Sequence, residues 1–265
     1  MNDERAPPPG ALPLAQHRAR KRFGQNFLHD PGVIARIVRA VTPRPDQHLI
    51  EIGPGQGAIT APLLEAAGKL TAIEIDRDLA AALRVRFAAF PGFRLLEQDV
   101  LKVNFAELAQ GLPPGSLRIL GNLPYNISTP LLFHLARFAD RVRDMHFMLQ
   151  LEVVERMVAA PSTAEYGRLS VSLQARCRME KLFKVSRGAF RPPPKVESAL
   201  VRLVPLPQPL EVDEVLLRTA FSARRKQLRN ALPGIDFAAL GIDPTLRPEN
   251  LSPQDYARLS MNSIL

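Results

Sequence analysis

Cysteine occurs once in the 265 residues, as Cys177, so the chain cannot form an internal disulfide bond. This excludes the disulfide-rich secreted folds and fits a reducing compartment, so we expect the protein in the cytoplasm. No stretch reaches the roughly 18 consecutive apolar residues of a membrane span, and the N-terminus has no apolar core of the signal-peptide type. The five histidines are scattered and no cluster of metal ligands is present, so we expect no bound metal and no membrane partner.

Basic side chains outnumber acidic ones, and the formal net charge is +9. Residues 51–136 carry 7 basic and 8 acidic side chains, whereas residues 137–191 carry 11 basic and 6 acidic ones. The excess positive charge therefore lies outside residues 51–136, as expected if a polyanion contacts the protein through other parts of the chain. Two local clusters are candidates for RNA binding, with a solvated helix face as the alternative for each. They are Arg18, Arg20, Lys21 and Arg22, and Arg224, Arg225, Lys226 and Arg229.

A glycine-rich loop follows the first apolar strand candidate, residues 49–52, with glycine at Gly53, Gly55 and Gly57. Glycines at alternate positions let the backbone turn tightly and approach a ligand closely. A dinucleotide site prefers Gly-x-Gly-x-x-Gly, which places a pyrophosphate at a helix N-terminus. The Gly-x-Gly-x-Gly spacing here instead resembles the S-adenosylmethionine loop of class I methyltransferases. A glycine-rich turn that holds no ligand is the alternative.

Three further strand candidates each end in a polar residue. In an open α/β sheet, ligands bind at the carboxyl ends of the strands, and an acid about 20 positions after the first glycine holds ribose hydroxyls. An isolated carboxylate is more often a solvated strand end, but the repetition strand by strand favours a cofactor. The segments are residues 70–73, 93–96 and 117–120, and the polar residues are Glu74, Asp99 and Asn122.

The last of these strands leads into Asn122-Leu123-Pro124-Tyr125, which suits chemistry on an exocyclic base amine. Such an amine is a poor nucleophile because its lone pair is delocalised into the ring. Asn122 offers a carboxamide oxygen, Pro124 a backbone carbonyl, and Tyr125 a ring that can stack on the base. Read alone, the motif is weak, because Asn and Pro are ordinary residues at a turn.

Four motifs together resemble the ribosomal RNA adenine dimethyltransferase family, over roughly residues 20 to 265, and most closely its bacterial small-subunit branch. The first is Lys-Arg-Phe-Gly-Gln-Asn-Phe-Leu at residues 21–28, and the second is Glu-Ile-Gly-Pro-Gly at residues 51–55. The third is Asn-Leu-Pro-Tyr-Asn-Ile-Ser at residues 122–128, and the fourth is Phe-Arg-Pro-Pro-Pro-Lys-Val-Glu-Ser at residues 190–198.

The resemblance implies an α/β fold with a Rossmann-like class I methyltransferase sheet, mostly parallel with an antiparallel last strand, and a small C-terminal helical domain. We expect a disordered extension over residues 1–16, a catalytic domain over residues 17–204 and an RNA-binding helical domain over residues 205–265. Asp30 and Pro31 predict the start of a helix. Residues 169–175 are predicted as a late strand, and residues 212–220, 223–232, 237–240 and 253–260 as short helices.

The resemblance also implies which residues hold the methyl donor, S-adenosylmethionine, and the target base. Asn26 and Leu28 would border the cofactor, Gly53 its amino-acid portion, Glu74 its ribose and Asp99 its adenine. Asn122 would lie between cofactor and base, and its oxygen and the Pro124 carbonyl would accept the target N6 hydrogens. Tyr125 would stack on the base, with Phe190 as a second face. The expected partner is 16S rRNA in the small ribosomal subunit, where two adjacent adenosines of a hairpin loop receive two methyls each.

Three other functions compete with this one. The large-subunit rRNA methyltransferase of macrolide resistance shares the core motifs, but residues 21–24 and 190–198 look more like the small-subunit branch. DNA adenine methyltransferases more often carry Asp-Pro-Pro-Tyr and a larger recognition insert, so no DNA partner is expected. A non-catalytic assembly factor could tolerate loss of Glu74, Asp99 or Asn122, and all three are intact. We expect a monomer.

Overall fold

The computed structural model describes residues 25–124 and 127–262, and it separates into two compact units. Within the described residues, unit 1 comprises residues 25–124, 127–150 and 182–200, and unit 2 comprises residues 151–181 and 201–262. The second unit therefore takes in residues 151–181, which lie ahead of the predicted boundary at 204/205. The extension over residues 1–16 lies outside the described part of the chain.

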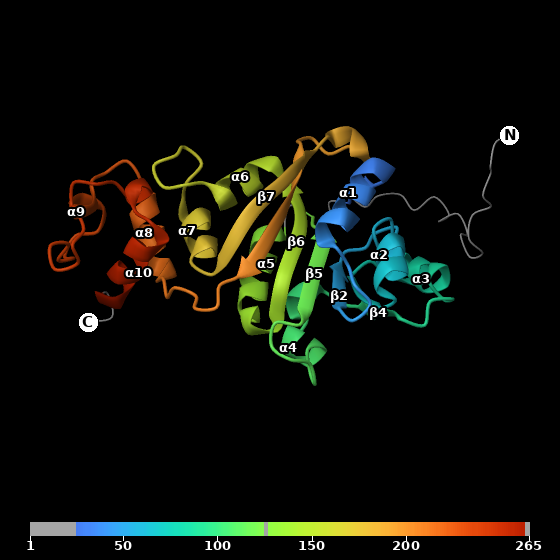
Figure 1. The fold of residues 1–265 in the computed structure, drawn as a ribbon. Helices are drawn as coiled ribbons and strands as arrows, with labels where there is room; N and C mark the ends of the chain where they lie inside the picture. The colour runs from blue at the N-terminus through green and yellow to red at the C-terminus, as the bar shows by residue number, and fades with distance from the viewer. Residues whose placement is uncertain (1–24, 125–126, 263–265) are drawn as a thin grey trace. The chain divides into compact units, whose positions relative to one another are not determined.

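A seven-stranded sheet runs through the fold in the order β4-β3-β2-β5-β6-β9-β7, with β2 to β6 paired in parallel (Figure 1). A separate two-stranded ladder pairs β1 antiparallel with β8. The predicted fold class, a mostly parallel Rossmann-like sheet with an antiparallel strand, is confirmed. The strands are β1 (Phe27–Leu28), β2 (His48–Ile52), β3 (Leu70–Glu74), β4 (Phe93–Glu97), β5 (Leu117–Asn122), β6 (Val142–Gln150), β7 (Cys177–Val185), β8 (Phe190–Arg191) and β9 (Ser198–Pro205).

Helices follow most of the strands, as βαβ connections require. Helix α1 begins as predicted, with Pro31 at its first turn and the Asp30 carboxylate accepting from the Val33 N–H at 2.9 Å. In unit 1 the helices are α1 (Pro31–Val41), α2 (Thr60–Ala67), α3 (Arg77–Arg86), α4 (Phe105–Leu108) and α5 (Ser128–Ala136). In unit 2 they are α6 (Leu151–Val158), α7 (Arg168–Gln174), α8 (Glu214–Ser222), α9 (Leu228–Ala231) and α10 (Pro253–Asn262).

Three of the sequence predictions are wrong in detail. Of residues 223–232, predicted as one helix, only Leu228–Ala231 are helical, as α9, and residues 223–226 form a turn and a bend. Residues 169–175, predicted as a strand, form helix α7, and the strand β7 begins only at Cys177. The error arises because apolar residues and serines alternate over residues 169–173, a period typical of a strand, although residues 170–173 are all buried in the helix. Residues 237–240, predicted as a helix, form a turn. The strands at residues 49–52, 70–73, 93–96 and 117–120 are confirmed within one or two residues at each end.

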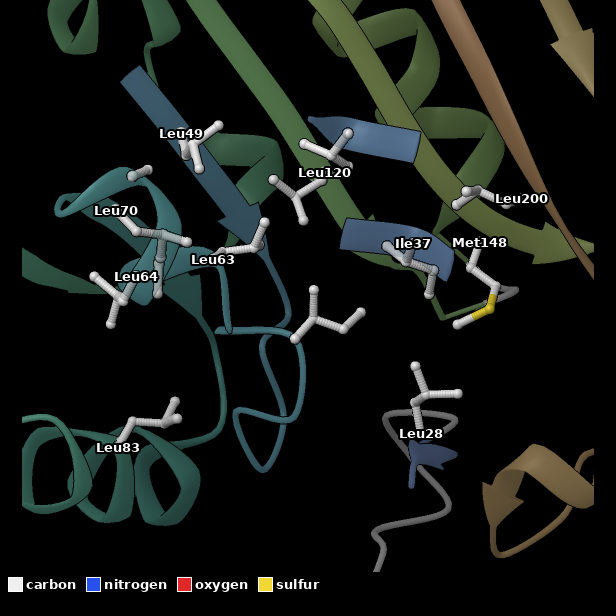
Figure 2. Packing of buried hydrophobic residues seen from close by; sticks show 14 of the residues in the cluster. Leu28, Ile37, Leu49, Leu63, Leu64, Leu70, Leu83, Leu120, Met148 and Leu200 are labelled. Carbon is white, nitrogen blue, oxygen red and sulfur yellow. The ribbon is translucent and has the colours of Figure 1, made fainter. Parts of the chain in front are cut away.

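The core of unit 1 lies between the sheet and its helices. Figure 2 labels Leu63 and Leu64 of α2, Leu49 of β2 and Leu120 of β5, which belong to one cluster of buried hydrophobic residues. Parallel strands are buried on both faces, which explains why β2 and β5 are buried over nearly their whole length rather than at alternate residues. Unit 2 has its own core, in which Tyr166, Leu217 and Tyr256 are fully buried.

Gly121 shows how closely the strands approach at the edge that carries the predicted site. It pairs with Ile52 in the register of β2 and β5, and a Cβ at this position would lie 2.4 Å from the Ile52 carbonyl oxygen. Backbone atoms cannot yield as a side chain would, so only glycine fits there. This glycine lets β5 deliver Asn122 beside the end of β2.

A candidate methyl-transfer site

The carboxyl ends of β2, β3 and β5 line one cavity. Its lining comprises Gln25, Asn26, Phe27, Leu28, Glu51, Ile52, Gly53, Pro54, Gly55, Gln56, Ala58, Ile59, Ile73, Glu74, Ile75, Leu79, Gln98, Asp99, Val100, Leu101, Asn122, Leu123, Pro124 and Ile127. The cavity therefore brings together seven of the predicted cofactor residues: Asn26, Leu28, Gly53, Gly55, Glu74, Asp99 and Asn122.

Two predicted residues lie elsewhere. Gly57 is outside the lining, and its positive φ and the Phe87 ring, 2.8 Å from where a Cβ would stand, give it a role in packing. Phe190 is only 2% exposed, packs in the core of unit 1 and does not line the cavity, so this structure does not present its ring to a base. Hydrophobic burial of β8 against that core accounts for its position. Tyr125 lies outside the described residues.

The glycine loop turns as its sequence predicts. Gly53 and Gly55 both have positive φ, 63° and 58°, in the region that favours glycine. The Gly55 N–H points to Glu74 Oε2 at 3.4 Å, and the Phe27 ring lies against Gly55 from the other side. The loop is thus fixed between the end of β3 and the strand β1.

Glu74 is held rigidly at the end of β3. Its Oε1 accepts from the backbone N–H groups of Ile75 and Asp76, each at 2.9 Å. Burial raises the pKa of Glu74, and these backbone hydrogen bonds oppose that effect. Because both N–H bonds fall on Oε1 and the Oε2 contact is long, Oε2 can accept from a hydroxyl group of a ligand.

Ile75 is a cavity residue that sequence reasoning did not single out. It is 48% exposed, although it is large and apolar, and it lines the cavity next to Glu74. An apolar side chain kept open beside an acid suits the flat face of a purine. The signal was present in the sequence, as an apolar residue between Glu74 and Asp76 at a strand end. Gln25 was also missed: its amide donates to Asp76 at 3.1 Å.

The Asn122 carboxamide has a defined orientation. Its Nδ2 donates to the backbone carbonyl of Asn26 at 2.9 Å, and a carbonyl can only accept, so the nitrogen must face β1. Oδ1 is then the atom available to a ligand. The Pro124 carbonyl, the second predicted acceptor, takes the Ile127 N–H at 3.2 Å and keeps a lone pair.

Among the described residues of the lining, every ionisable side chain is acidic. Glu51, Glu74 and Asp99 contribute carboxyl groups, and no lysine, arginine or histidine of residues 25–124 and 127–262 lines the cavity. In a chain of net charge +9, this selects against the phosphates of a dinucleotide and suits a positively charged ligand. S-adenosylmethionine, with its sulfonium and ammonium groups, meets this requirement. Among the described residues no group of His, Cys, Asp and Glu is placed to hold a metal ion.

Comparison with known proteins identifies the family. The family model of ribosomal RNA adenine dimethylase matches residues 16–261. The chain belongs to this family. It is an S-adenosylmethionine-dependent rRNA adenine dimethyltransferase, as the sequence motifs predicted.

Individual relatives and solved structures agree with the match. Ribosomal RNA small subunit methyltransferase A of Pseudomonas putida is 55% identical over 256 residues, 92% of this chain and 95% of that protein. The crystal structure of a dimethyladenosine transferase from Plasmodium falciparum is similar with a TM-score of 0.78 and 26% identity, covering 89% and 96% of the two chains. That of 23S rRNA methyltransferase ErmE is similar with a TM-score of 0.69 and 26% identity, covering 91% and 100%.

Arg224 in the second predicted RNA-binding cluster of this dimethylase makes contacts within unit 2. Its Nε lies 2.5 Å from Glu249 Oε2, and its Nη2 donates to the Ala164 carbonyl at 2.8 Å. Arg225, Lys226 and Arg229 are exposed. The first cluster, with Arg20, Lys21 and Arg22, lies outside the described residues. No helix in the described part of the chain has the length and apolar character to cross a membrane.

Glu51 predicts a pH dependence of stability. It is fully buried, accepts from Thr60 Oγ1 at 2.6 Å, and burial raises its pKa to about 7. The unfolded chain loses this proton near its ordinary value of 4.5, so the free energy of unfolding should fall as the pH rises from about 4.5 to 7. At about 1.4 kcal/mol per pH unit, the Glu51 contribution is about 3 kcal/mol.

Glu51→Gln, which keeps the size but cannot ionise, should flatten this part of the profile. Urea unfolding of both proteins between pH 5 and pH 8 measures the difference in their free energies of unfolding. Contributions of the other titrating groups are the same in both proteins and cancel in this difference. Parallel profiles for the two forms would contradict a protonated Glu51 in the folded protein.

Proposed function

We propose that this dimethyltransferase methylates N6 of two adjacent adenosines in a hairpin loop near the 3′ end of 16S rRNA. Its substrate would be the small ribosomal subunit, in the cytoplasm, at a late step of subunit formation. The small-subunit relatives, of which one is 55% identical over 92% of this chain, support this substrate. The acid-lined cavity beside the Asn122 carboxamide is the observation that carries the chemistry.

The chain's own residues would hold the donor. Glu74 Oε2 accepts from the ribose, Asp99 from the adenine amine, and Ile75 packs on the purine face. Gly53 and Gly55 allow the backbone to approach the amino-acid portion, and the carboxylates of Glu74 and Asp99 favour a positively charged ligand in the cavity. S-adenosylmethionine supplies an already activated methyl group.

Asn122 and Pro124 would hold the target amine. Oδ1 of Asn122 and the Pro124 carbonyl accept the two N6 hydrogens, which directs the nitrogen lone pair toward the methyl group. Tyr125 stacks on the base, which must first leave its RNA stack, at least cost from a loop. Positioning of this kind contributes several kcal/mol. The amine becomes acidic only once methylated, so water takes its proton and no strong base is required.

The decisive test uses small-subunit particles from undermethylated cells and radiolabelled cofactor. Primer extension should map the label to two adjacent adenosines near the 3′ end of 16S rRNA. Fully methylated particles are the matched control and should take up no label. Label in 23S rRNA would instead assign the chain to the large subunit, and no label in any RNA would assign it to a non-catalytic role.

Loss of the Glu74 carboxylate should weaken binding of the donor. Hydrogen bonds to a charged group contribute about 1.5–3 kcal/mol, so Glu74→Ala should reduce the affinity for S-adenosylmethionine by about tenfold to a hundredfold. Glu97→Ala is the control, because Glu97 lies opposite Glu74 in the register of β3 and β4 but is exposed and pairs with Arg84 at 2.9 Å. Titration calorimetry measures both, and equal affinities would remove Glu74 from the donor site.

A further inference from the structure

Residues 184–195 form a basic segment that does not line the cavity. It carries four basic side chains and no acidic one, namely Lys184, Arg187, Arg191 and Lys195. All four are exposed, and within the described part of the chain none of them lies within an ion-pair distance of a carboxylate. Elsewhere in unit 1 exposed arginines do pair, as Arg77 and Arg84 do with Glu97. The charge of the basic segment is therefore available to a ligand.

This segment lies along one edge of the cavity that would hold the methyl donor. Strand β8 within it pairs with β1, so that Arg191 lies opposite Phe27, a lining residue. The His29 N–H donates to the Ala189 carbonyl at 3.0 Å and extends this ladder. Since side chains alternate along a strand and Phe190 is buried, Arg191 points outward. Arg187 Nη1 donates to the Lys195 carbonyl at 3.4 Å, which places these two residues beside each other.

The chemistry of the cavity specifies what the basic segment binds. A base that enters the cavity leaves its phosphate and those of the neighbouring nucleotides at the rim. The part of the lining that the structure describes holds carboxyl groups and no basic side chain, so it offers these phosphates no counter-charge, whereas the basic segment beside it does. Arginine matches phosphate oxygens with two parallel hydrogen bonds, and unpaired arginines beside a base pocket suit this contact.

We propose that the basic segment binds the phosphates of the RNA strand that flanks the target adenosine. This surface is additional to the two clusters predicted from the sequence, and it rests on the proposed function. The contact positions the strand without reading its sequence, because phosphates carry no base identity.

The test compares two triple variants of the full chain that lose the same charge. Arg187→Ala, Arg191→Ala and Lys195→Ala remove the basic segment. Arg77→Ala, Arg84→Ala and Arg94→Ala, at the β4 edge of the sheet, are the matched control. Binding to undermethylated small-subunit particles and to protein-free 16S rRNA is measured between 50 and 400 mM KCl.

Each lost phosphate contact lowers the slope of log affinity against log salt by about 0.7–0.9. The basic-segment triple should therefore lower the slope by about 2 to 3 on both RNA substrates, while the control keeps the wild-type slope. Arg187→Lys with Arg191→Lys should retain the slope, because the charge is kept. Both triples should bind S-adenosylmethionine within twofold of wild type, which shows an intact cavity.

Three results would overturn the inference: an unchanged slope for the basic-segment triple, an equal fall in the control, or a loss on particles but not on free RNA. A loss on particles but not on free RNA would mean that the basic segment binds a ribosomal protein. Failure of the proposed function is seen separately, because wild-type protein would then leave the adenosines of undermethylated particles unlabelled.

Discussion

Asn122→Ala is expected to lower kcat by about 10²–10³-fold while the affinity for RNA stays within twofold of wild type. The substitution removes an acceptor whose contribution is made mainly in the transition state, and loss of one such preorganised group has an effect of this size. Single-turnover methylation of undermethylated particles gives the rate, and filter binding gives the affinity. A rate within threefold of wild type would remove Asn122 from the catalytic role.

Asn122→Asp tests the orientation of the carboxamide rather than its presence. The carbonyl of Asn26, 2.9 Å from Nδ2, would face a carboxylate oxygen, and two acceptors repel each other. Protonation of the new carboxyl restores a donor, so activity of this variant should rise relative to wild type as the pH falls. Parallel pH profiles for the two proteins would show that Asn26 does not orient residue 122.

Asp144→Ala is expected to produce the largest loss of stability in unit 1. Arg118 of β5 and Asp144 of β6 face each other in register and form two parallel hydrogen bonds of 2.9 Å, at 5% and 2% exposure. Arg118 also donates to Gln47 at 2.7 Å. Removing the carboxylate leaves a buried guanidinium without its counter-charge, at a cost of about 3–5 kcal/mol. Urea unfolding followed by circular dichroism measures the shift.

Asp140→Ala is the control, because Asp140 pairs with Arg141 at 3.0 Å on the surface. An exposed pair contributes at most about 1 kcal/mol, so this variant should unfold near the wild-type midpoint. The double variant Arg118→Met with Asp144→Leu should recover part of the loss, since replacing both partners removes the isolated charge. A single variant as stable as the control would mean that water or another group solvates Arg118.

Local patterns made the site largely predictable. The apolar runs that end in Glu74, Asp99 and Asn122 identify a strand edge, because parallel strands present their carboxyl ends together. The positive φ of Gly53 and Gly55 follows from their residue type. These features depend on short segments and on the order of elements, both of which can be read from a single chain.

Features that depend on distant partners could not be read in this way. The burial of Phe190 depends on the pairing of β8 with β1, about 160 residues earlier, and nothing near Phe190 in the sequence reports it. Arg224 belongs to the same basic cluster as Arg225 and Lys226. Its side chain, however, pairs with Glu249, which lies 25 residues further along the chain. The ion pair of Arg118 and Asp144 likewise requires the register of two strands. Helix α7 was predicted as a strand because apolar residues and serines alternate over residues 169–173, with the period of a strand.

The acidic side chains in the described lining of the cavity affect repeated turnover. Transfer of a methyl group leaves S-adenosylhomocysteine, whose sulfur is neutral, so the carboxyl groups that attracted the donor lose one of the two positive charges they faced. Attraction between opposite charges a few ångströms apart contributes a few kcal/mol at the effective dielectric constant near a protein surface. S-adenosylhomocysteine is thus bound less tightly than S-adenosylmethionine. An enzyme that transfers several methyl groups to one RNA must exchange the product for a new donor each time. Weaker binding of the product favours this exchange.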